Sequence, residues 1–111
     1  MSADQNMSMI TEDIVRDAMR ECYDPEIPVN VVDLGLIYGI LIDDSIPDEA
    51  NVFIKMTLTA PGCGMGPMIA NDVKTRILQI PGVKNARVDL TFDPLWNPSM
   101  MSEEARLALG M

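Results

Sequence analysis

Cys63 is the residue whose sequence surroundings most favour chemistry. It lies in the run Thr59-Ala60-Pro61-Gly62-Cys63-Gly64, between the end of a predicted strand and the first turn of a predicted helix. Unpaired N–H groups and the positive end of a helix dipole favour a thiolate at such a position. The small neighbouring residues leave room for a metal ion or a partner to approach the sulfur. Spacing alone does not distinguish this role from that of a structural thiol.

Three carboxylates form a second candidate cluster. Asp24, Glu26 and Asp33 lie within ten residues of one another, in or beside a loop that contains two prolines and is therefore stiff. Carboxylates in loops are commonly solvated. Asp33, however, opens a long apolar stretch, so if it is partly buried we expect it to have a specific partner. Backbone N–H groups of a neighbouring turn are the predicted donors.

Histidine is absent from the chain, which excludes Ser-His and Cys-His catalytic pairs and His-based metal sites within one chain. The second cysteine, Cys22, is 41 positions from Cys63, so there is no CxxC pair and no disulfide framework. Cys22 falls on the apolar stripe of the first predicted helix, where we expect a small buried hydrophobe. A thiol enzyme ranks last because no imidazole is present to activate a nucleophile, and we expect no enzymatic activity.

Composition limits the remaining classes of protein. The chain has 111 residues, enough for a single domain with one core. Its 17 acidic and 8 basic residues give a formal net charge of -9, which disfavours nucleic acid and anionic membranes as partners. We see neither a signal peptide nor a run of 18 apolar residues. These features predict a cytoplasmic protein with reduced thiols.

The elements that must position these residues follow from hydrophobic periodicity. We expect a disordered tail over residues 1–8 and one domain over residues 9–111. The domain should begin with an amphipathic helix from about Thr11, its N-cap, to Glu21. Apolar and β-branched residues predict a first strand over Val31–Ile42, and strict alternation predicts a second, antiparallel strand over Val52–Thr59.

The second half of the chain repeats the change from helix to strand. A second helix should have an apolar face from Met65 to Ile80, including Met68, and should end at Pro81-Gly82. A third strand is predicted over residues 87–93, and a short helix from Ser102 to near Gly110. The order α-β-β-α-β-α predicts a small α/β (α+β) domain with a mixed three-stranded sheet and packed helices.

Four ordered motifs resemble the MIP18 family (DUF59), and within it the SufT-like iron–sulfur cluster assembly proteins. The resemblance covers about Thr11 to Gly110, and four motifs at compatible spacing are more specific than any one of them. The motifs are Asp24-Pro25-Glu26-Ile27-Pro28-Val29, Asp33-Leu34-Gly35-Leu36-Ile37-Tyr38, Leu58-Thr59-Ala60-Pro61-Gly62-Cys63-Gly64 and Trp96-Asn97-Pro98-Ser99-Met100-Met101-Ser102-Glu103. Ala60 and Ile27 depart from the hydroxyl residue and the leucine that are common in relatives.

The resemblance implies a SUF-type maturation factor that assists the transfer or insertion of iron–sulfur clusters into apoproteins. The functional surface implied by the motifs holds Asp24, Glu26, Thr59 and Cys63, and we add Asp33 from its position in the sequence. Since clusters normally take four protein ligands, we expect none to be bound stably. A labile cluster or iron shared between subunits, with Cys63 as a transient ligand, is the favoured hypothesis.

The alternative is a non-catalytic adaptor that binds clients and assembly proteins through its surface, with Cys63 structural. The tail that contains Trp96 and Met100-Met101 would then be the anchor, although packing against the sheet is its more ordinary role. Under both hypotheses the partners are iron–sulfur assembly proteins and apo-client proteins, and a homodimer is compatible with either.

Overall fold

The computed structural model describes residues 10–24, 27–46, 49–59 and 66–110. The predicted tail over residues 1–8 lies outside this part. The elements follow the predicted order α-β-β-α-β-α, with one short 3-10 helix added before the last helix. They are α2 (Glu12–Met19), β1 (Ile37–Asp43), β2 (Ala50–Met56), α3 (Gly66–Leu78), β3 (Val83–Leu90), the 3-10 helix Pro98–Met100 and α4 (Glu103–Ala108).

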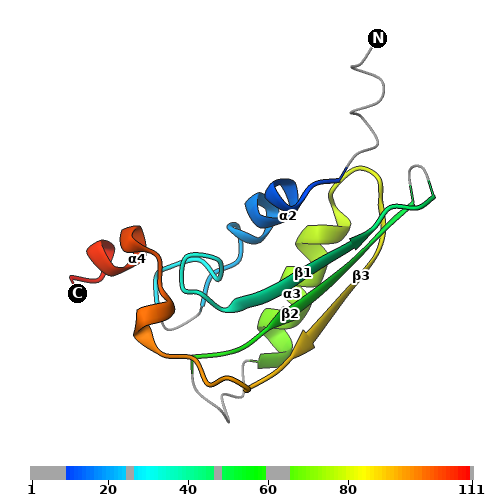
Figure 1. The fold of residues 1–111 in the computed structure, drawn as a ribbon. Helices are drawn as coiled ribbons and strands as arrows, with labels where there is room; N and C mark the ends of the chain where they lie inside the picture. The colour runs from blue at the N-terminus through cyan, green and yellow to red at the C-terminus, as the bar shows by residue number, and fades with distance from the viewer. Residues whose placement is uncertain (1–9, 25–26, 47–48, 60–65, 111) are drawn as a thin grey trace.

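The three strands form the predicted mixed sheet, in the order β1-β2-β3. β1 is antiparallel to β2, and β2 is parallel to β3, which it joins through α3. Figure 1 shows α3 behind the sheet, with α2 close to it. β2 alternates accordingly, with Val52, Ile54 and Met56 buried towards the helices and Phe53 and Lys55 exposed on the opposite face.

The first strand is shorter than predicted, because residues 31–35 form turns and β1 begins only at Ile37. The side-chain oxygen of Asn30 accepts hydrogen bonds from the backbone N–H groups of Val32 (3.0 Å) and Asp33 (2.9 Å). Gly35 then adopts a φ of 80°, which ends the turn. Apolar residues in this turn are buried like those of a strand, so composition alone did not separate the two.

The other boundaries move by a few residues. Thr11 is the N-cap of α2 as predicted and accepts from the Ile14 N–H at 3.2 Å, but the helix ends at Met19 rather than Glu21. β2 starts earlier than predicted and ends before Thr59, and β3 starts at Val83 and ends before Phe92. The parallel pairing of these two strands, from Ala50 with Val83 to Met56 with Leu90, sets their bounds. Met68, predicted on the apolar face of α3, is 60% exposed.

The C-terminal helix agrees with its prediction. Ser102 is the N-cap of α4, and its hydroxyl oxygen accepts from the Ala105 N–H at 3.1 Å. Ala105 is buried, and Gly110, with a φ of 76°, follows the end of the helix. Among the described helices, none is long and apolar enough to cross a membrane.

The segment between β3 and α4 is bound to the turn that precedes β1. The Trp96 indole N–H donates to the Leu34 carbonyl at 2.6 Å, and the Ser102 N–H donates to the Asp33 carbonyl at 2.8 Å. Tyr38 at the start of β1 donates its hydroxyl to the Pro94 carbonyl at 3.0 Å. Trp96 is half-buried and packs against the core, and Met101 is 4% exposed, so both have the more ordinary packing role that the sequence suggested for this tail.

Gly35 allows the turn before β1 to approach the segment between β3 and α4. We expect Gly35→Ala to destabilise the protein by about 3 kcal/mol. A Cβ atom at this position would overlap the Met100 carbonyl group, and its φ of 80° is unfavourable for alanine. Gly82→Ala is the matched control, because Gly82 has a φ of 96° but only ordinary contacts with Ile10 at 3.5 Å. Urea unfolding should show a cost of only about 1 kcal/mol for the control. Equal losses for the two variants would show that backbone strain, rather than the contact with Met100, accounts for the effect.

Candidate functional site

The structure describes three of the five predicted site residues, Asp24, Asp33 and Thr59. Glu26 and Cys63 lie outside the described residues. Asp24 is 7% exposed and follows α2. Its carboxylate accepts a hydrogen bond from the Ile27 N–H at 3.2 Å, and its own N–H donates to the Val29 carbonyl at 3.4 Å. Asp24 therefore links the start of the loop after α2 to Ile27 and Val29 further along the chain. Glu26 falls between these residues in the sequence.

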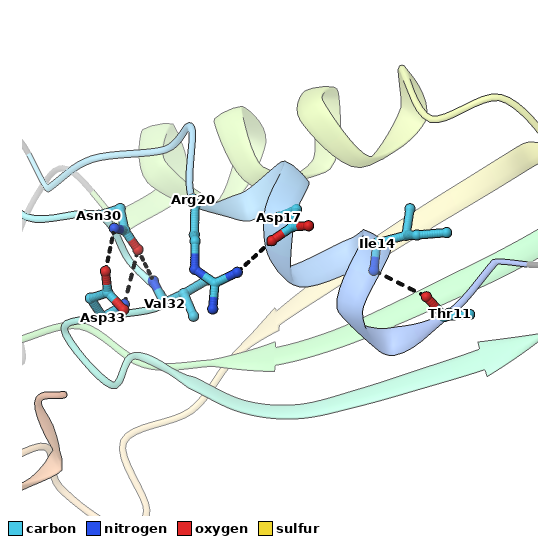
Figure 2. Close-up of polar contacts among 7 residues, drawn as sticks. All are labelled: Thr11, Ile14, Asp17, Arg20, Asn30, Val32 and Asp33. Carbon is cyan, nitrogen blue, oxygen red and sulfur yellow. Dashed lines mark hydrogen bonds and ion pairs between the residues drawn. The ribbon is translucent and has the colours of Figure 1, made fainter.

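Asp33 has a specific partner, as predicted, but the partner is a side chain rather than the backbone of a neighbouring turn. Its carboxylate accepts from the Asn30 amide nitrogen at 2.8 Å. Figure 2 shows the dashed lines that join the Asn30 side chain to Asp33 and to Val32, whose N–H groups its oxygen caps. Since Asn30 donates through its nitrogen and accepts through its oxygen, one side chain sets both the turn and the orientation of the carboxylate.

Asn30 was not selected from the sequence, although a signal was present. Asparagine readily accepts hydrogen bonds from backbone N–H groups two residues further along the chain, which starts a turn. The run Asn30-Val31-Val32-Asp33 fits that pattern, but the apolar residues inside it resemble the start of a strand. The competing strand signal explains why the predicted site included Asp33 and omitted Asn30.

Asp33 faces α4 as well as its own turn. It lines a shallow hollow of about 240 Å³ together with Tyr23, Asn30 and Glu104. The Asp33 backbone carbonyl also accepts the Ser102 N–H at the start of α4. The second and fourth sequence motifs therefore meet at Asp33, which ties this carboxylate to the C-terminal segment.

Thr59 is half-buried. It follows β2 and precedes Cys63 by four residues in the sequence. Two residues earlier, Thr57 is completely buried, and its hydroxyl oxygen has no hydrogen-bond partner within the described part of the chain. Its backbone N–H donates to the Leu36 carbonyl at 2.8 Å. The pairing of β1 with β2 is thereby extended by one hydrogen bond towards Thr59.

Cys22 is completely buried, as predicted, and is unsuited to bind a metal. Burial, followed by the charge of Asp72 and a hydrogen bond with that carboxylate, raises the pKa of the Cys22 thiol from 9.0 to about 12. The thiolate is the form that binds metals, and it is scarce at neutral pH in such a group. Because Cys22 is excluded, Cys63 is the one thiol of the chain left for that chemistry.

The described residues contain no group of three or more Cys, Asp or Glu side chains placed to hold a metal ion. The four ion pairs that the structure describes all involve solvent-exposed or half-exposed side chains, such as Lys84 with Glu49 at 2.9 Å, and add little to stability. The fold and the described site thus define a small α+β domain without histidine, with one cysteine buried and protonated.

Comparison with known proteins places this domain in a family. Residues 12–90 match the family model described as iron-sulfur cluster assembly protein. An Fe-S protein maturation auxiliary factor of Porphyromonas gingivalis is 52% identical over 99 residues, which cover 89% of this chain and 90% of that protein. The chain therefore belongs to the iron–sulfur cluster assembly protein family, as the sequence motifs predicted.

Two further comparisons agree with this assignment. The Fe-S protein maturation auxiliary factor SufT of Staphylococcus aureus is 41% identical over 88 residues, covering 79% of this chain and 96% of that protein. The crystal structure of a DUF59 domain from Bacillus anthracis superposes with a TM-score of 0.81 at 34% identity, covering 90% of this chain and 92% of that one. The mixed sheet and its helices are therefore the fold of this family.

The turn that presents Asp33 should depend on Asn30. Asn30→Ala removes three hydrogen bonds, two to backbone N–H groups and one to the Asp33 carboxylate, and we expect it to lower the free energy of unfolding by about 2 kcal/mol. Asp33→Asn is the matched control, because it keeps the Asn30 cap and alters only the carboxylate. Urea unfolding should show a loss below about 1 kcal/mol for the control. A smaller loss for Asn30→Ala than for Asp33→Asn would contradict this account of the turn.

The raised pKa of Cys22 predicts a loss of stability at alkaline pH. Above pH 9 the thiol ionises in the unfolded chain, whereas in the folded protein it stays protonated until about pH 12. Ionisation therefore favours the unfolded state, and stability should fall between these values by up to about 1.4 kcal/mol per pH unit. Urea unfolding of the wild type and of Cys22→Ala at several pH values isolates this effect. Parallel pH profiles for the two proteins would show that the Cys22 pKa is not raised.

Proposed function

We propose that this protein is a SUF-type iron–sulfur maturation factor that assists the transfer or insertion of clusters into apoproteins, with Cys63 as a transient ligand of the cargo. The observation that carries the proposal is the 52% identity to an Fe-S protein maturation auxiliary factor along about nine tenths of both chains. Cargo here means iron or a cluster that passes through the protein as a substrate.

The donor set limits how the cargo can be held. A [2Fe–2S] or [4Fe–4S] cluster normally requires four protein ligands, mostly thiolates. This chain has no histidine and two cysteines, of which Cys22 is buried with a pKa of about 12. One chain therefore supplies Cys63 alone as a thiolate, so the remaining ligands come from a second subunit, a client, carboxylates or small thiols. Such a site suits transfer better than storage.

In the described part of the site, hydrogen bonds hold the carboxylates of Asp24 and Asp33 in fixed positions, which supports this role. Asp24 joins the two sides of the loop next to Glu26, and Asn30 orients Asp33. Thr59 follows β2 and precedes Cys63 by four residues. We propose that Asp24, Glu26 and Thr59 form the surface on which Cys63 meets its partners, which are assembly proteins and apo-clients.

In the adaptor alternative Cys63 is structural, and the tail that the sequence suggested as its anchor packs against the domain. Trp96 donates to the Leu34 carbonyl, and Met101 is buried. Trp96→Ala would therefore disturb the fold together with any contact to a partner. Neither proposal includes catalysis of a reaction on a metabolite, since the chain has no imidazole to act as a general base.

Anaerobic loading tests the role of Cys63. The purified protein is incubated with iron and sulfide, and bound iron, bound sulfide and visible absorption are measured for the wild type, Cys63→Ser and Cys22→Ala. We expect the wild type and Cys22→Ala to bind cargo and Cys63→Ser to lose at least about nine tenths of it, because the only other thiol of the chain, Cys22, is buried and protonated. The loaded proteins are then mixed with an apo-aconitase-type client, whose activity reports transfer.

The outcomes separate the two hypotheses. Equal loading of Cys63→Ser and the wild type would overturn the ligand role of Cys63. Normal client maturation by Cys63→Ser, without any loading, would support the adaptor. Cys22→Ala is the appropriate control because it removes the other thiol and keeps a small apolar side chain in the core.

A further inference from the structure

β1 is an edge strand of the sheet. It pairs with β2 on one side, and no described residue makes a backbone hydrogen bond to its other side. Figure 1 shows β1 and β3 at the two opposite edges of the sheet. Since an open edge offers free N–H and C=O groups to another strand, proteins normally protect it with charged residues or proline.

The two edges differ in this protection. β3 contains Lys84, Arg87 and Asp89, all exposed. β1 reads Ile-Tyr-Gly-Ile-Leu-Ile-Asp, without lysine or proline, and its one charge is at the last position. Leu41 in the middle of this edge strand is 65% exposed. β1 is therefore suited to pair with another strand, and β3 is not.

The face of the sheet that points away from the helices has a hollow beside this edge. It has a volume of about 380 Å³ and is lined by residues 38–41 of β1, by Phe53, Ile54 and Lys55 of β2, and by Asp89. Gly39, which is paired with Lys55, adds no side chain to this face, whereas Leu41, paired with Phe53, projects from it. The projecting Leu41 side chain and the gap at Gly39 are thus two residues apart on β1.

We propose that β1 pairs in the antiparallel direction with β1 of a second copy of this chain, about a two-fold axis at Ile40. In that register Leu41 of each copy lies opposite Gly39 of the other and fills the hollow beside it. Ile40 is also the centre of Ile37–Asp43, so the same register overlaps the two strands completely. Asp43 then faces Ile37, and no like charges oppose each other across the pair.

This fit favours pairing with a second copy, because both strands must carry a projecting side chain and a gap at positions related by the two-fold axis. Leu41 and Gly39 meet this requirement in each copy. The result is a continuous six-stranded sheet with the helices of both copies on one face. An interface limited to one pair of strands is small, so the dimer should be weak and concentration-dependent. Each copy has a formal net charge of -9, and the resulting repulsion is screened by salt. The dimer should therefore strengthen as ionic strength rises.

Sedimentation equilibrium over a range of protein and NaCl concentrations tests the dimer. We expect a monomer–dimer equilibrium that salt strengthens, and a dissociation constant at least about 10-fold higher for Leu41→Lys, which loses two buried leucines per dimer and adds charge to the edge. Leu107→Lys is the matched control, because Leu107 of α4 is 71% exposed and distant in sequence from the edge. A wild type that is monomeric throughout, or equal effects of the two variants, would overturn the proposal.

Disulfide cross-linking tests the register. In a Cys63→Ser background, Ile40→Cys places two thiols directly opposite each other at the axis, whereas Ile42→Cys places them four residues apart, or about 13 Å. Both positions are half-buried on β1. Mild oxidation should yield a covalent dimer with Ile40→Cys only. A covalent dimer with Ile42→Cys in its place would refute the two-fold axis at Ile40. The proposal does not rest on the iron–sulfur role, so the two can fail separately.

Discussion

The contact between the turn at residues 33–35 and the segment at residues 94–102 is the constraint on which the rest of the structure depends. Gly35 approaches the Met100 backbone more closely than any side chain would allow. On either side of it, Asp33 accepts the Ser102 N–H and Leu34 accepts the Trp96 indole. Leu34 and Leu36 in this region are completely buried, and β1 begins directly after them at Ile37.

The same contact connects the candidate site to the C-terminus. Asp33 accepts from Asn30 through its side chain and from Ser102 through its carbonyl, so the orientation of the carboxylate and the start of α4 are set together. The second and fourth motifs of the family are about 60 residues apart in the sequence and yet form one unit. This explains why the C-terminal motif belongs to the fold of the domain.

The chemistry of the protein is limited by what it lacks. Without histidine, and with Cys22 buried beside Asp72, one chain offers a single thiol, Cys63, to a cluster that normally takes four protein ligands. The weak, shared binding at Cys63 that we propose follows from this limited set of donors. The pairing of two copies through β1 that we propose depends on the sheet edge and is independent of this chemistry.

Elements with strong local signals could be predicted from the sequence. The caps at Thr11 and Ser102, the alternation of β2 and the burial of Cys22 agree with the structure because each follows from neighbouring residues or a short period. The start of β1 and the partner of Asp33 could not be predicted. Both depend on Asn30, whose hydrogen bonds compete with the strand propensity of Val31 and Val32.

The sequence by itself determined the order of the elements, the mixed sheet, the family and the exclusion of histidine chemistry, because periodicity and motif spacing are local properties of the chain. Only the tertiary structure decided that Trp96 and Met101 pack inward, that Asp33 pairs with Asn30, and that β1 is left as an unprotected edge. These features arise where distant segments compete for the same backbone groups and the same buried space, and residue order does not resolve that competition.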